Sequence, residues 1–277
     1  MTVAEALHEA ARRLEAVTDT ARLDAELLMA ETLGVSRSEL LLRHMSDPEP
    51  DLFAALVARR LAHEPVAQIL GRKEFYGREF RVGRAVLTPR ADSEATVQAA
   101  LEVCASDARI LDCGTGSGAL LLTLLAERPR ARGVGIDCSE AALAVAADNA
   151  RRLGLADRAE MRRIDWREPR WRDGLGTFEL VVANPPYVED SADLPPSVRD
   201  YEPAEALYAG PEGLDDYRVL IPQLAALLRP GGAAVLEIGA AQAEPVAGIA
   251  AASGFRSELR RDLADRPRAL ILRLGLV

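Results

Sequence analysis

Polar and aromatic residues able to do chemistry follow a strongly apolar stretch in the second half of the chain. Asn184-Pro185-Pro186-Tyr187 comes directly after Leu180-Val181-Val182-Ala183. Because proline fixes φ and donates no backbone hydrogen bond, the two prolines end a buried strand and hold the following residues rigidly. The Asn184 oxygen and a nearby carbonyl can accept two N–H bonds from a planar nitrogen group, while the Tyr187 ring covers its flat face. Asn-Pro also starts ordinary turns, so these four residues leave both interpretations open.

A second candidate site lies earlier in the chain, at Ile-Leu-Asp-Cys-Gly-Thr-Gly-Ser-Gly, residues 110–118. The pattern predicts a strand that enters a glycine-rich turn and opens a helix, where the backbone can approach a ligand closely. The third glycine, Gly118, comes one residue too early for a dinucleotide fold, and no phosphate-binding lysine follows. Asp137 ends the next predicted strand, roughly 20 residues on, where an acid suits the two ribose hydroxyls of an adenosine.

The elements that must position these residues alternate from Arg109 onward. Such alternation predicts an α/β fold with a mostly parallel sheet covered on both faces. The last two strands are joined only by residues 260–268, too short for a crossover helix, so one of them should run antiparallel. We predict strands at 109–112, 133–137, 159–165, 178–183, 233–238, 255–259 and 269–274, and helices at 117–127, 140–153, 214–228 and 243–252.

The N-terminal part has a different pattern. Thr2-x-x-Glu5 and Ser36-x-x-Glu39 have capping-box spacing, and Gly34 ends a helical run. These signals predict a bundle of four short helices with no visible chemistry. Alternating aromatic and polar residues around glycines at 74–83 then predict a β-hairpin. We therefore expect a helical bundle at 1–70, a hairpin linker at 71–87 and a catalytic domain at 88–277.

Composition excludes several classes of protein. A chain of 277 residues with 49% hydrophobic content can bury a full core, and a net charge of −9 argues against gripping nucleic acid through many phosphates. Cys104, Cys113 and Cys138 form no Cys-x-x-Cys pair, which predicts small buried residues, no disulfide and no metal site. All three histidines lie within the first 63 residues, which removes most triad hydrolases for the larger part of the chain.

The first residues lack a basic start and an apolar signal core, and no stretch has the apolar length needed to span a bilayer. We therefore expect a cytoplasmic protein without a membrane partner.

The glycine pattern, the acid ending the second strand and the inferred sheet resemble the S-adenosylmethionine-dependent methyltransferases. The resemblance implies a seven-stranded, Rossmann-like sheet, mostly parallel with one antiparallel strand, and S-adenosylmethionine as cofactor. It places Asp165-Trp166 beside the adenine, although an ordinary core or lid aromatic is the simpler interpretation of Trp166 alone. The cofactor residues it implies are Asp112, Gly114, Thr115, Gly116, Ser117, Gly118, Asp137, Asp165, Trp166 and Asn184.

Enzymes of this fold that carry Asn/Asp-Pro-Pro-Tyr methylate planar amino or amide nitrogens, and this chain is similar to one branch of them along nearly its whole length. That branch is the PrmC/HemK family, protein-(glutamine-N5) methyltransferases that act on peptide chain release factors. The resemblance implies that the substrate is the glutamine of a Gly-Gly-Gln loop and that the bundle helps to dock that protein. Its motifs are Glu74-Phe75-Tyr76-Gly77, Asn184 to Val188, Tyr201-Glu202-Pro203, Ala206-Leu207, Gly213-Leu214-Asp215, Tyr217-Arg218, Gly231-Gly232, Glu237-Ile238-Gly239, Gln242 and Asp262-Leu263.

The roles implied at the reaction centre fall on Asn184, Pro185 and Tyr187 as catalytic residues. Asn184, Pro185, Pro186 and Tyr187 would also hold the substrate. One departure affects the loop before the first core helix, where the family usually has Ile-Pro-Arg-Pro-Glu-Thr-Glu and this chain has Thr88-Pro89-Arg90-Ala91-Asp92-Ser93-Glu94. Arg90 and Glu94 are kept as candidate substrate-pocket or lid residues, with helix capping as the alternative for Glu94.

Other functions remain open from the residues themselves. A DNA or RNA adenine-N6 methyltransferase can carry the same four residues, but should show a basic face or a target-recognition segment. A binding module that kept the cofactor pocket without catalysis is a second alternative, which intact Asn184 and Tyr187 argue against. A nicotinamide oxidoreductase is disfavoured by the glycine spacing.

Overall fold

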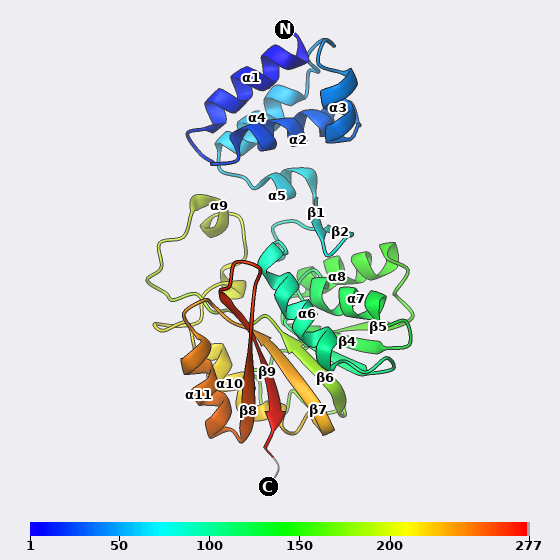
Figure 1. Ribbon diagram of the computed structural model, residues 1–277, viewed down its shortest axis with the longest axis vertical. Coiled ribbons are helices and arrows are strands. Elements are labelled where there is room, and N and C mark those ends of the chain that lie inside the picture. The colour runs from blue at the N-terminus through cyan, green and yellow to red at the C-terminus, as the bar shows by residue number, and fades with distance from the viewer. Residues whose placement is uncertain (276–277) are drawn as a thin grey trace. The chain divides into compact units, whose positions relative to one another are not determined.

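A computed structural model of the chain describes residues 1–275 and divides them into two compact units (Figure 1). The first unit comprises residues 1–72 and 194–201, and the second comprises residues 73–193 and 202–275. The last two positions of the expected catalytic domain, 276–277, lie outside the described residues. No helix within the described range is long and apolar enough to cross a membrane.

The first unit is a helical bundle. The predicted capping box at Thr2 and Glu5 is present, and Gly34 ends a helix in the left-handed conformation. Leu7, Leu28 and Phe53 are buried at its centre. Its helices are α1 (Val3–Leu14), α2 (Ala21–Leu33), α3 (Arg37–Arg43), α4 (Phe53–Leu61), α5 (Val66–Leu70) and the short α9 (Pro196–Arg199).

The bundle contains more helices than the predicted four. Pro65 precedes α5 in an extended conformation, and Gly71 ends it in a left-handed one, so these two residues frame a single-turn helix that hydrophobic periodicity is too short to reveal. The helix α9 joins the unit from far along the chain, since Tyr201 donates from its hydroxyl to the Ala62 carbonyl at 2.7 Å. Gln68 Nε2 donates to the Tyr201 carbonyl at 2.8 Å.

The predicted hairpin forms from β1 (Arg72–Phe75) and β2 (Arg78–Arg81). Its Phe75 and Phe80 rings meet edge to face at 6.1 Å between centroids. Both rings are buried against Val97 in the core of the second unit. The segment expected to be a linker is therefore part of that unit's core, because its aromatic side chains point inward.

The second unit is built on a seven-stranded sheet, in agreement with the predicted fold class. Its order is β5-β4-β3-β6-β7-β9-β8, and only β9 runs antiparallel to its neighbours. The strands are β3 (Arg109–Cys113), β4 (Arg132–Asp137), β5 (Ala159–Arg163), β6 (Phe178–Ala183), β7 (Leu228–Glu237), β8 (Phe255–Arg261) and β9 (Pro267–Leu274). The strand β7 starts earlier than predicted, because Leu228 already pairs with Phe178 before a register shift.

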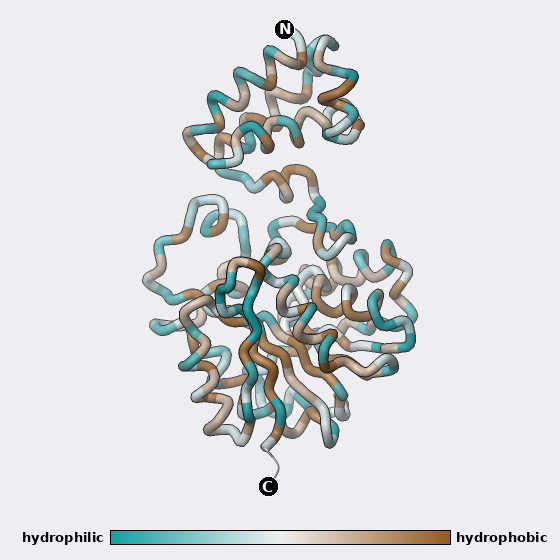
Figure 2. The backbone as a smooth tube through the Cα atoms, in the orientation of Figure 1, coloured by the Kyte–Doolittle hydropathy of each residue, from teal (hydrophilic) through white to brown (hydrophobic). Residues whose placement is uncertain are grey.

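Helices cover both faces of this sheet. One face packs against α10 (Asp215–Leu224) and α11 (Ala243–Ala252), and the other against α6 (Glu94–Val103), α7 (Ala119–Glu127) and α8 (Glu140–Arg152). Short 3-10 turns η1 (Ala91–Ser93) and η2 (Ala204–Ala206) complete the unit. Figure 2 shows the central strands as the most hydrophobic part of the unit, as expected for strands buried on both faces.

The prediction that all three cysteines are buried is wrong for one of them. Cys104 and Cys113 are buried, whereas Cys138 is exposed. It follows the last residue of β4, where the chain leaves the sheet at its carboxyl edge, so it lies in a loop and not in the core.

Candidate active site

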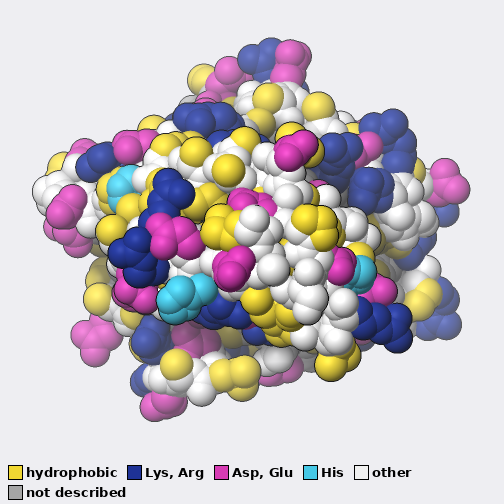
Figure 3. Space-filling model, turned by 90° about the horizontal axis from the view of Figure 1, so that it is seen from above, with side chains coloured by type: hydrophobic (Ala, Val, Ile, Leu, Met, Phe, Trp, Pro, Cys, Tyr) yellow, Lys and Arg dark blue, Asp and Glu magenta, His cyan; other side chains and the backbone are white. Residues whose placement is uncertain are grey.

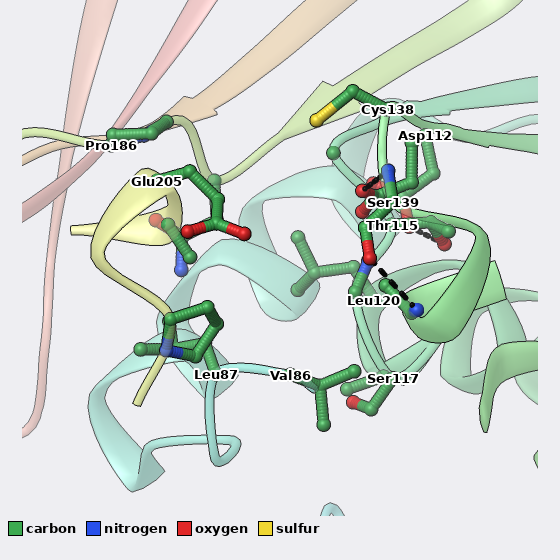
Figure 4. A pocket seen from close by; sticks show the side chains of 18 of the residues that line it. Val86, Leu87, Asp112, Thr115, Ser117, Leu120, Cys138, Ser139, Pro186 and Glu205 are labelled. Atoms are coloured by element: carbon green, nitrogen blue, oxygen red, sulfur yellow. Dashed lines mark hydrogen bonds between the residues drawn. The ribbon is translucent and has the colours of Figure 1, made fainter. Parts of the chain in front are cut away.

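A pocket opens at the carboxyl edge of the sheet, beyond the ends of β3, β4 and β6. Figure 4 shows Pro186 and Glu205 on one side of the open space and Asp112, Thr115 and Cys138 on the other. Most of the predicted site residues line this pocket: Arg90, Asp112, Gly114, Thr115, Gly116, Ser117, Asp137, Asp165, Trp166, Asn184 and Pro186. As far as the chain is described, Gly118, Pro185, Tyr187 and Glu94 are not part of its wall.

The glycine-rich turn between β3 and α7 is fixed to the neighbouring strand. The backbone N–H groups of Gly114 and Thr115 both donate to the Ile136 carbonyl at 2.9 Å. Gly114 has a φ of +76°, and an added Cβ there would lie 3.1 Å from the Trp166 ring. Glycine therefore lets the turn reverse direction while keeping the ring close to it.

Asp112 ends β3 with a buried carboxyl group. Its Oδ2 accepts a hydrogen bond from the Thr115 hydroxyl at 2.7 Å, whereas its buried Oδ1 has no hydrogen-bond partner within residues 1–275. Burial raises the pKa of Asp112 from 3.8 to about 7, although the Thr115 hydrogen bond acts in the opposite direction. An unused buried acceptor on the wall of a pocket suits a ligand that brings its own donor.

Asp137 ends β4 and lies opposite the glycine-rich turn. Its Oδ2 accepts from the Gly116 N–H at 3.0 Å and its Oδ1 from the Ser139 N–H at 2.9 Å. These bonds hold the carboxylate in one orientation, and each oxygen still has a lone pair for a further donor. Asp137 is therefore a fixed carboxylate at the end of β4, on the pocket wall.

Trp166 is held in the pocket wall by a residue that the sequence did not point to. Its Nε1 donates to Asp216 Oδ1 at 3.1 Å, and both Asp216 oxygens also accept from the Arg167 guanidinium at 2.8 Å. Asp216 is fully buried at the start of α10. Asp165 accepts from the Arg167 N–H at 2.8 Å, which orders the turn that carries Trp166.

The Asn-Pro-Pro-Tyr segment leaves the end of β6 in this pocket. Asn184 and Pro186 line the wall, whereas Pro185 is buried and Tyr187 is half-buried. Burial, and next the Glu237 carboxyl group, raise the pKa of the Tyr187 hydroxyl, so it stays protonated at neutral pH. The following residue is tied down as well, since Val188 donates to the Leu207 carbonyl at 2.8 Å.

Arg90 and Glu94 have separate positions. Arg90 lines the pocket, and its Nη2 donates to the buried Glu202 carboxylate at 2.6 Å. The Glu94 carboxylate instead accepts from the Tyr76 N–H at 3.1 Å and so joins the hairpin to α6. The predicted pocket role of Glu94 is therefore not supported by its position: the first turn of α6 directs its side chain at the hairpin.

Several wall residues were not predicted as site residues. They come from the loop after the hairpin and from η2, and include Val86, Leu87, Pro203, Glu205 and Ala206. These segments carry no periodic pattern and meet the glycine-rich turn only in the folded chain. The family motifs at Tyr201-Glu202-Pro203 and Ala206-Leu207 were signals in the sequence that could have drawn attention to the second of these segments.

The pocket combines fixed carboxylates, glycine backbone and an indole ring. Carboxylates that accept from hydroxyl and ammonium groups, together with a flat apolar ring, suit a nucleoside that carries a positive charge. The Asn184 amide stands at the same edge, so a second, planar polar group can be held beside that ligand.

Comparisons with known proteins agree with this reading of the fold. Residues 5–71 match the PrmC N-terminal domain, and residues 105–250 match a methyltransferase domain. The crystal structure of a methyltransferase from Pyrococcus furiosus covers 79% of the chain and 98% of its own, with a TM-score of 0.51 at 15% identity. A likeness at that identity supports the fold alone.

Two relatives are similar along almost their whole length, and both are named "Release factor glutamine methyltransferase". The protein from Cereibacter sphaeroides is 44% identical over 282 residues, covering 99% of each chain. The one from Moorella thermoacetica is also 44% identical over 282 residues, covering 98% of each chain. Together with the matched N-terminal and methyltransferase domains, this similarity places the chain in the family of release factor glutamine methyltransferases.

Proposed function

We propose that this enzyme transfers a methyl group from S-adenosylmethionine to the side-chain amide nitrogen, N5, of the glutamine in the Gly-Gly-Gln loop of peptide chain release factors. The observation that carries the proposal is the full-length similarity to relatives named for this activity, which includes the N-terminal domain. Since release factors work in translation, the reaction is expected in the cytoplasm.

The pocket residues fit the cofactor. Asp137 would accept from the ribose hydroxyls, and Trp166 would stack on the adenine beside Asp165. The unused Asp112 Oδ1 would accept from the cofactor ammonium group, directly or through water. When bound, S-adenosylmethionine supplies an electrophilic methyl group on a positively charged sulfur.

The enzyme must also hold and activate the amide nitrogen of the substrate, which is a weak nucleophile. An amide nitrogen shares its lone pair with the carbonyl, so it attacks only when that lone pair is freed. Asn184 Oδ1 and the Pro185 carbonyl would accept hydrogen bonds from both N–H groups and stabilise the positive charge that grows on nitrogen. As the N–C bond forms, the C–S bond breaks and leaves S-adenosylhomocysteine, and the methylated nitrogen loses one of its two protons to water. Tyr187 would fix the plane of the amide, and alignment of the two groups would account for much of the remaining barrier.

The protonated state of Tyr187 fits this role. A phenol is already neutral at pH 7, and burial raises the pKa of Tyr187 further, so the neutral ring would serve as a surface for the amide. The accepting oxygens of Asn184 and Pro185 do not titrate, so they can accept hydrogen bonds without a change of protonation state. The reaction is therefore expected to depend on geometry more than on a general base.

Nucleic acid is a poor alternative substrate. The net charge of the chain is −9, and Figure 3 shows basic and acidic side chains interspersed on the face that it presents, without a continuous basic surface there. An adenine-N6 methyltransferase needs positive charge to hold its strand. Release factors are therefore the proposed partners, with the N-terminal bundle as part of their docking surface.

The test compares substrates under one condition. The enzyme is incubated with methyl-labelled S-adenosylmethionine and a release factor, a release factor whose loop glutamine is replaced by alanine, or an adenine-containing duplex. We expect label only on the unaltered release factor, and mass spectrometry should place it on the glutamine side chain. Label on the duplex, or equal label on both release factors, would contradict the proposal.

A further inference from the structure

Three loops at the carboxyl edge of the sheet meet at the side chain of Gln242, the residue before α11. Its Nε2 donates to the Tyr187 carbonyl at 3.0 Å and to the Gly213 carbonyl at 3.1 Å. Its Oε1 accepts from the Gly239 N–H at 3.0 Å. One amide thereby joins the segment after β6, the loop before α10 and the loop after β7.

Two glycines lie close to this amide. Gly213 has a φ of +65°, and a Cβ there would collide with the Tyr187 carbonyl oxygen. A Cβ on Gly239 would lie 2.7 Å from Gln242 Oε1 and 3.4 Å from the Tyr187 ring. The loops can approach this closely only because these two positions lack side chains.

The hydrogen-bonding pattern determines the chemistry of the position. Both N–H bonds of the amide point at carbonyl oxygens, and its oxygen points at an N–H, so the orientation of the amide follows from its partners. A carboxylate would keep one oxygen for the Gly239 N–H but turn its other oxygen, an acceptor, toward the two carbonyl oxygens. An apolar side chain would leave all three backbone groups without this partner.

The bonded carbonyl belongs to Tyr187 itself. The position of that peptide group helps to set where the Tyr187 ring lies, three residues after Asn184. A misplacement of about 1 Å can cost on the order of a hundredfold in rate. A hydrogen bond that fixes the Tyr187 carbonyl can therefore affect the rate of methyl transfer, although Gln242 does not contact the substrate.

We propose that Gln242 is a positioning residue for methyl transfer: it fixes the Tyr187 backbone, and through it the ring that holds the substrate amide. This inference rests on the proposed function. The role proposed for Gln242 differs from that of the cofactor residues, since Gln242 does not line the pocket in the described part of the chain.

The test uses Gln242→Met, which keeps the side-chain volume and removes all three hydrogen bonds, and Gln242→Glu, which keeps the acceptor for Gly239 and removes the donors. Steady-state methylation of a release factor is measured with S-adenosylhomocysteine binding and thermal unfolding. We expect kcat to fall about tenfold to a hundredfold in both variants, while the Kd for S-adenosylhomocysteine stays within about threefold. An unchanged kcat in both variants would overturn the inference.

Arg158→Met is the matched control, because Arg158 Nη1 donates to the Leu125, Arg128 and Ala131 carbonyls at 2.9, 3.2 and 3.0 Å. These groups lie near the amino end of β4, away from the pocket. This variant should lose stability and keep kcat. If it loses kcat as strongly as Gln242→Met, the effect reflects general destabilisation and the inference falls.

Hydrogen exchange provides a readout that does not depend on the substrate. In Gln242→Met the amide protons of residues 187–190 should exchange faster than in the unaltered protein, and in Arg158→Met they should not. If the unaltered enzyme leaves release factors unmethylated, the proposed function fails, while exchange still decides whether Gln242 holds this segment. Unchanged exchange in Gln242→Met would overturn the inference on its own.

Discussion

Asn184 combines a position in the pocket wall with an amide oxygen suited to accept from the substrate. We expect Asn184→Ala to lower kcat by about a hundredfold or more, because an acceptor that stabilises developing charge is lost. Isothermal titration with S-adenosylhomocysteine should show a far smaller change in affinity. An equal loss in cofactor binding and in turnover would instead make Asn184 a cofactor residue only.

We expect Asp112 to make binding of the proposed cofactor sensitive to pH. Its pKa of about 7 in the free protein means that the carboxyl group is largely protonated at pH 6 and charged at pH 8. The charged form attracts the positively charged cofactor, so affinity should rise with pH up to about pH 7 and level off above it. Titration calorimetry at several pH values measures this.

The ligand itself also titrates, and Asp112→Asn separates the two effects. The variant should bind more weakly at pH 8 and lose the part of the pH dependence that belongs to the protein. If the variant and the unaltered enzyme show the same slope of affinity against pH, Asp112 does not contact the cofactor cation.

At the scale of elements, α10 contacts a residue of the pocket wall through one buried carboxylate. Asp216 holds both Trp166 and Arg167, which lie on the turn after β5. We expect Asp216→Ala to weaken S-adenosylhomocysteine binding by about tenfold, because the indole loses its anchor and a charge-assisted bond is removed. Asp216→Asn keeps an acceptor for the indole and should lose less. Equal affinity in Asp216→Ala and the unaltered protein would show that packing alone holds Trp166.

The contacts of Asp216 illustrate which features the sequence could predict and which it could not. The strand Phe178–Ala183 was recognisable because most of it is the apolar run Leu180 to Ala183, as expected for a strand buried on both faces. Asp216 was not recognisable, since 49 or 50 residues separate it from its partners and nothing local marks it. The prediction for Cys138 was wrong for a related reason. Cysteine is a residue type that is usually buried, but the exposure of Cys138 depends on its position just after the end of β4.

Loops were the least predictable elements. Glu205 lines the pocket from η2, a turn without hydrophobic period, and Gln242 joins segments that lie far apart in the chain. In both cases the function of the residue depends on which loops meet at the edge of the sheet. The carboxyl ends of parallel strands share that edge by the rule of the fold, whereas the contacts between loops there depend on the folded chain.

At the scale of the whole molecule, a second buried carboxyl group affects stability. Glu237 ends β7, accepts from the Thr96 hydroxyl at 3.2 Å, and has a pKa raised from 4.5 to about 7 chiefly by burial. Between these values the folded chain keeps a proton that the unfolded chain has lost. The free energy of unfolding therefore falls as pH rises through this window, by on the order of 3 kcal/mol for one such group, and is flat above it.

Glu237→Gln should remove this contribution while keeping the side-chain shape. Urea unfolding at pH 5 and pH 8 should show a smaller loss of stability on going to pH 8 than in the unaltered protein. Glu205→Gln is the control, since its exposed side chain should leave the pH dependence unchanged. If the Glu237→Gln variant loses as much stability as the unaltered protein, Glu237 is already charged in the folded state at pH 5.

The N-terminal bundle is proposed to help dock the intact release factor. Leu42 on α3 is 81% exposed, an apolar side chain available to a docked partner. We expect Leu42→Glu to raise the KM for an intact release factor by about tenfold, because burial of a leucine contributes about 1.5–3 kcal/mol, and to leave kcat unchanged. With a short peptide that contains only the Gly-Gly-Gln loop, the variant and the unaltered enzyme should have the same KM, since such a peptide lacks the part of the release factor that we propose contacts the bundle. Leu274→Glu, at the end of β9 that lies away from the pocket, is the control and should change neither value. If Leu42→Glu impairs the peptide and the intact factor alike, the leucine acts through the fold of the enzyme and not through docking.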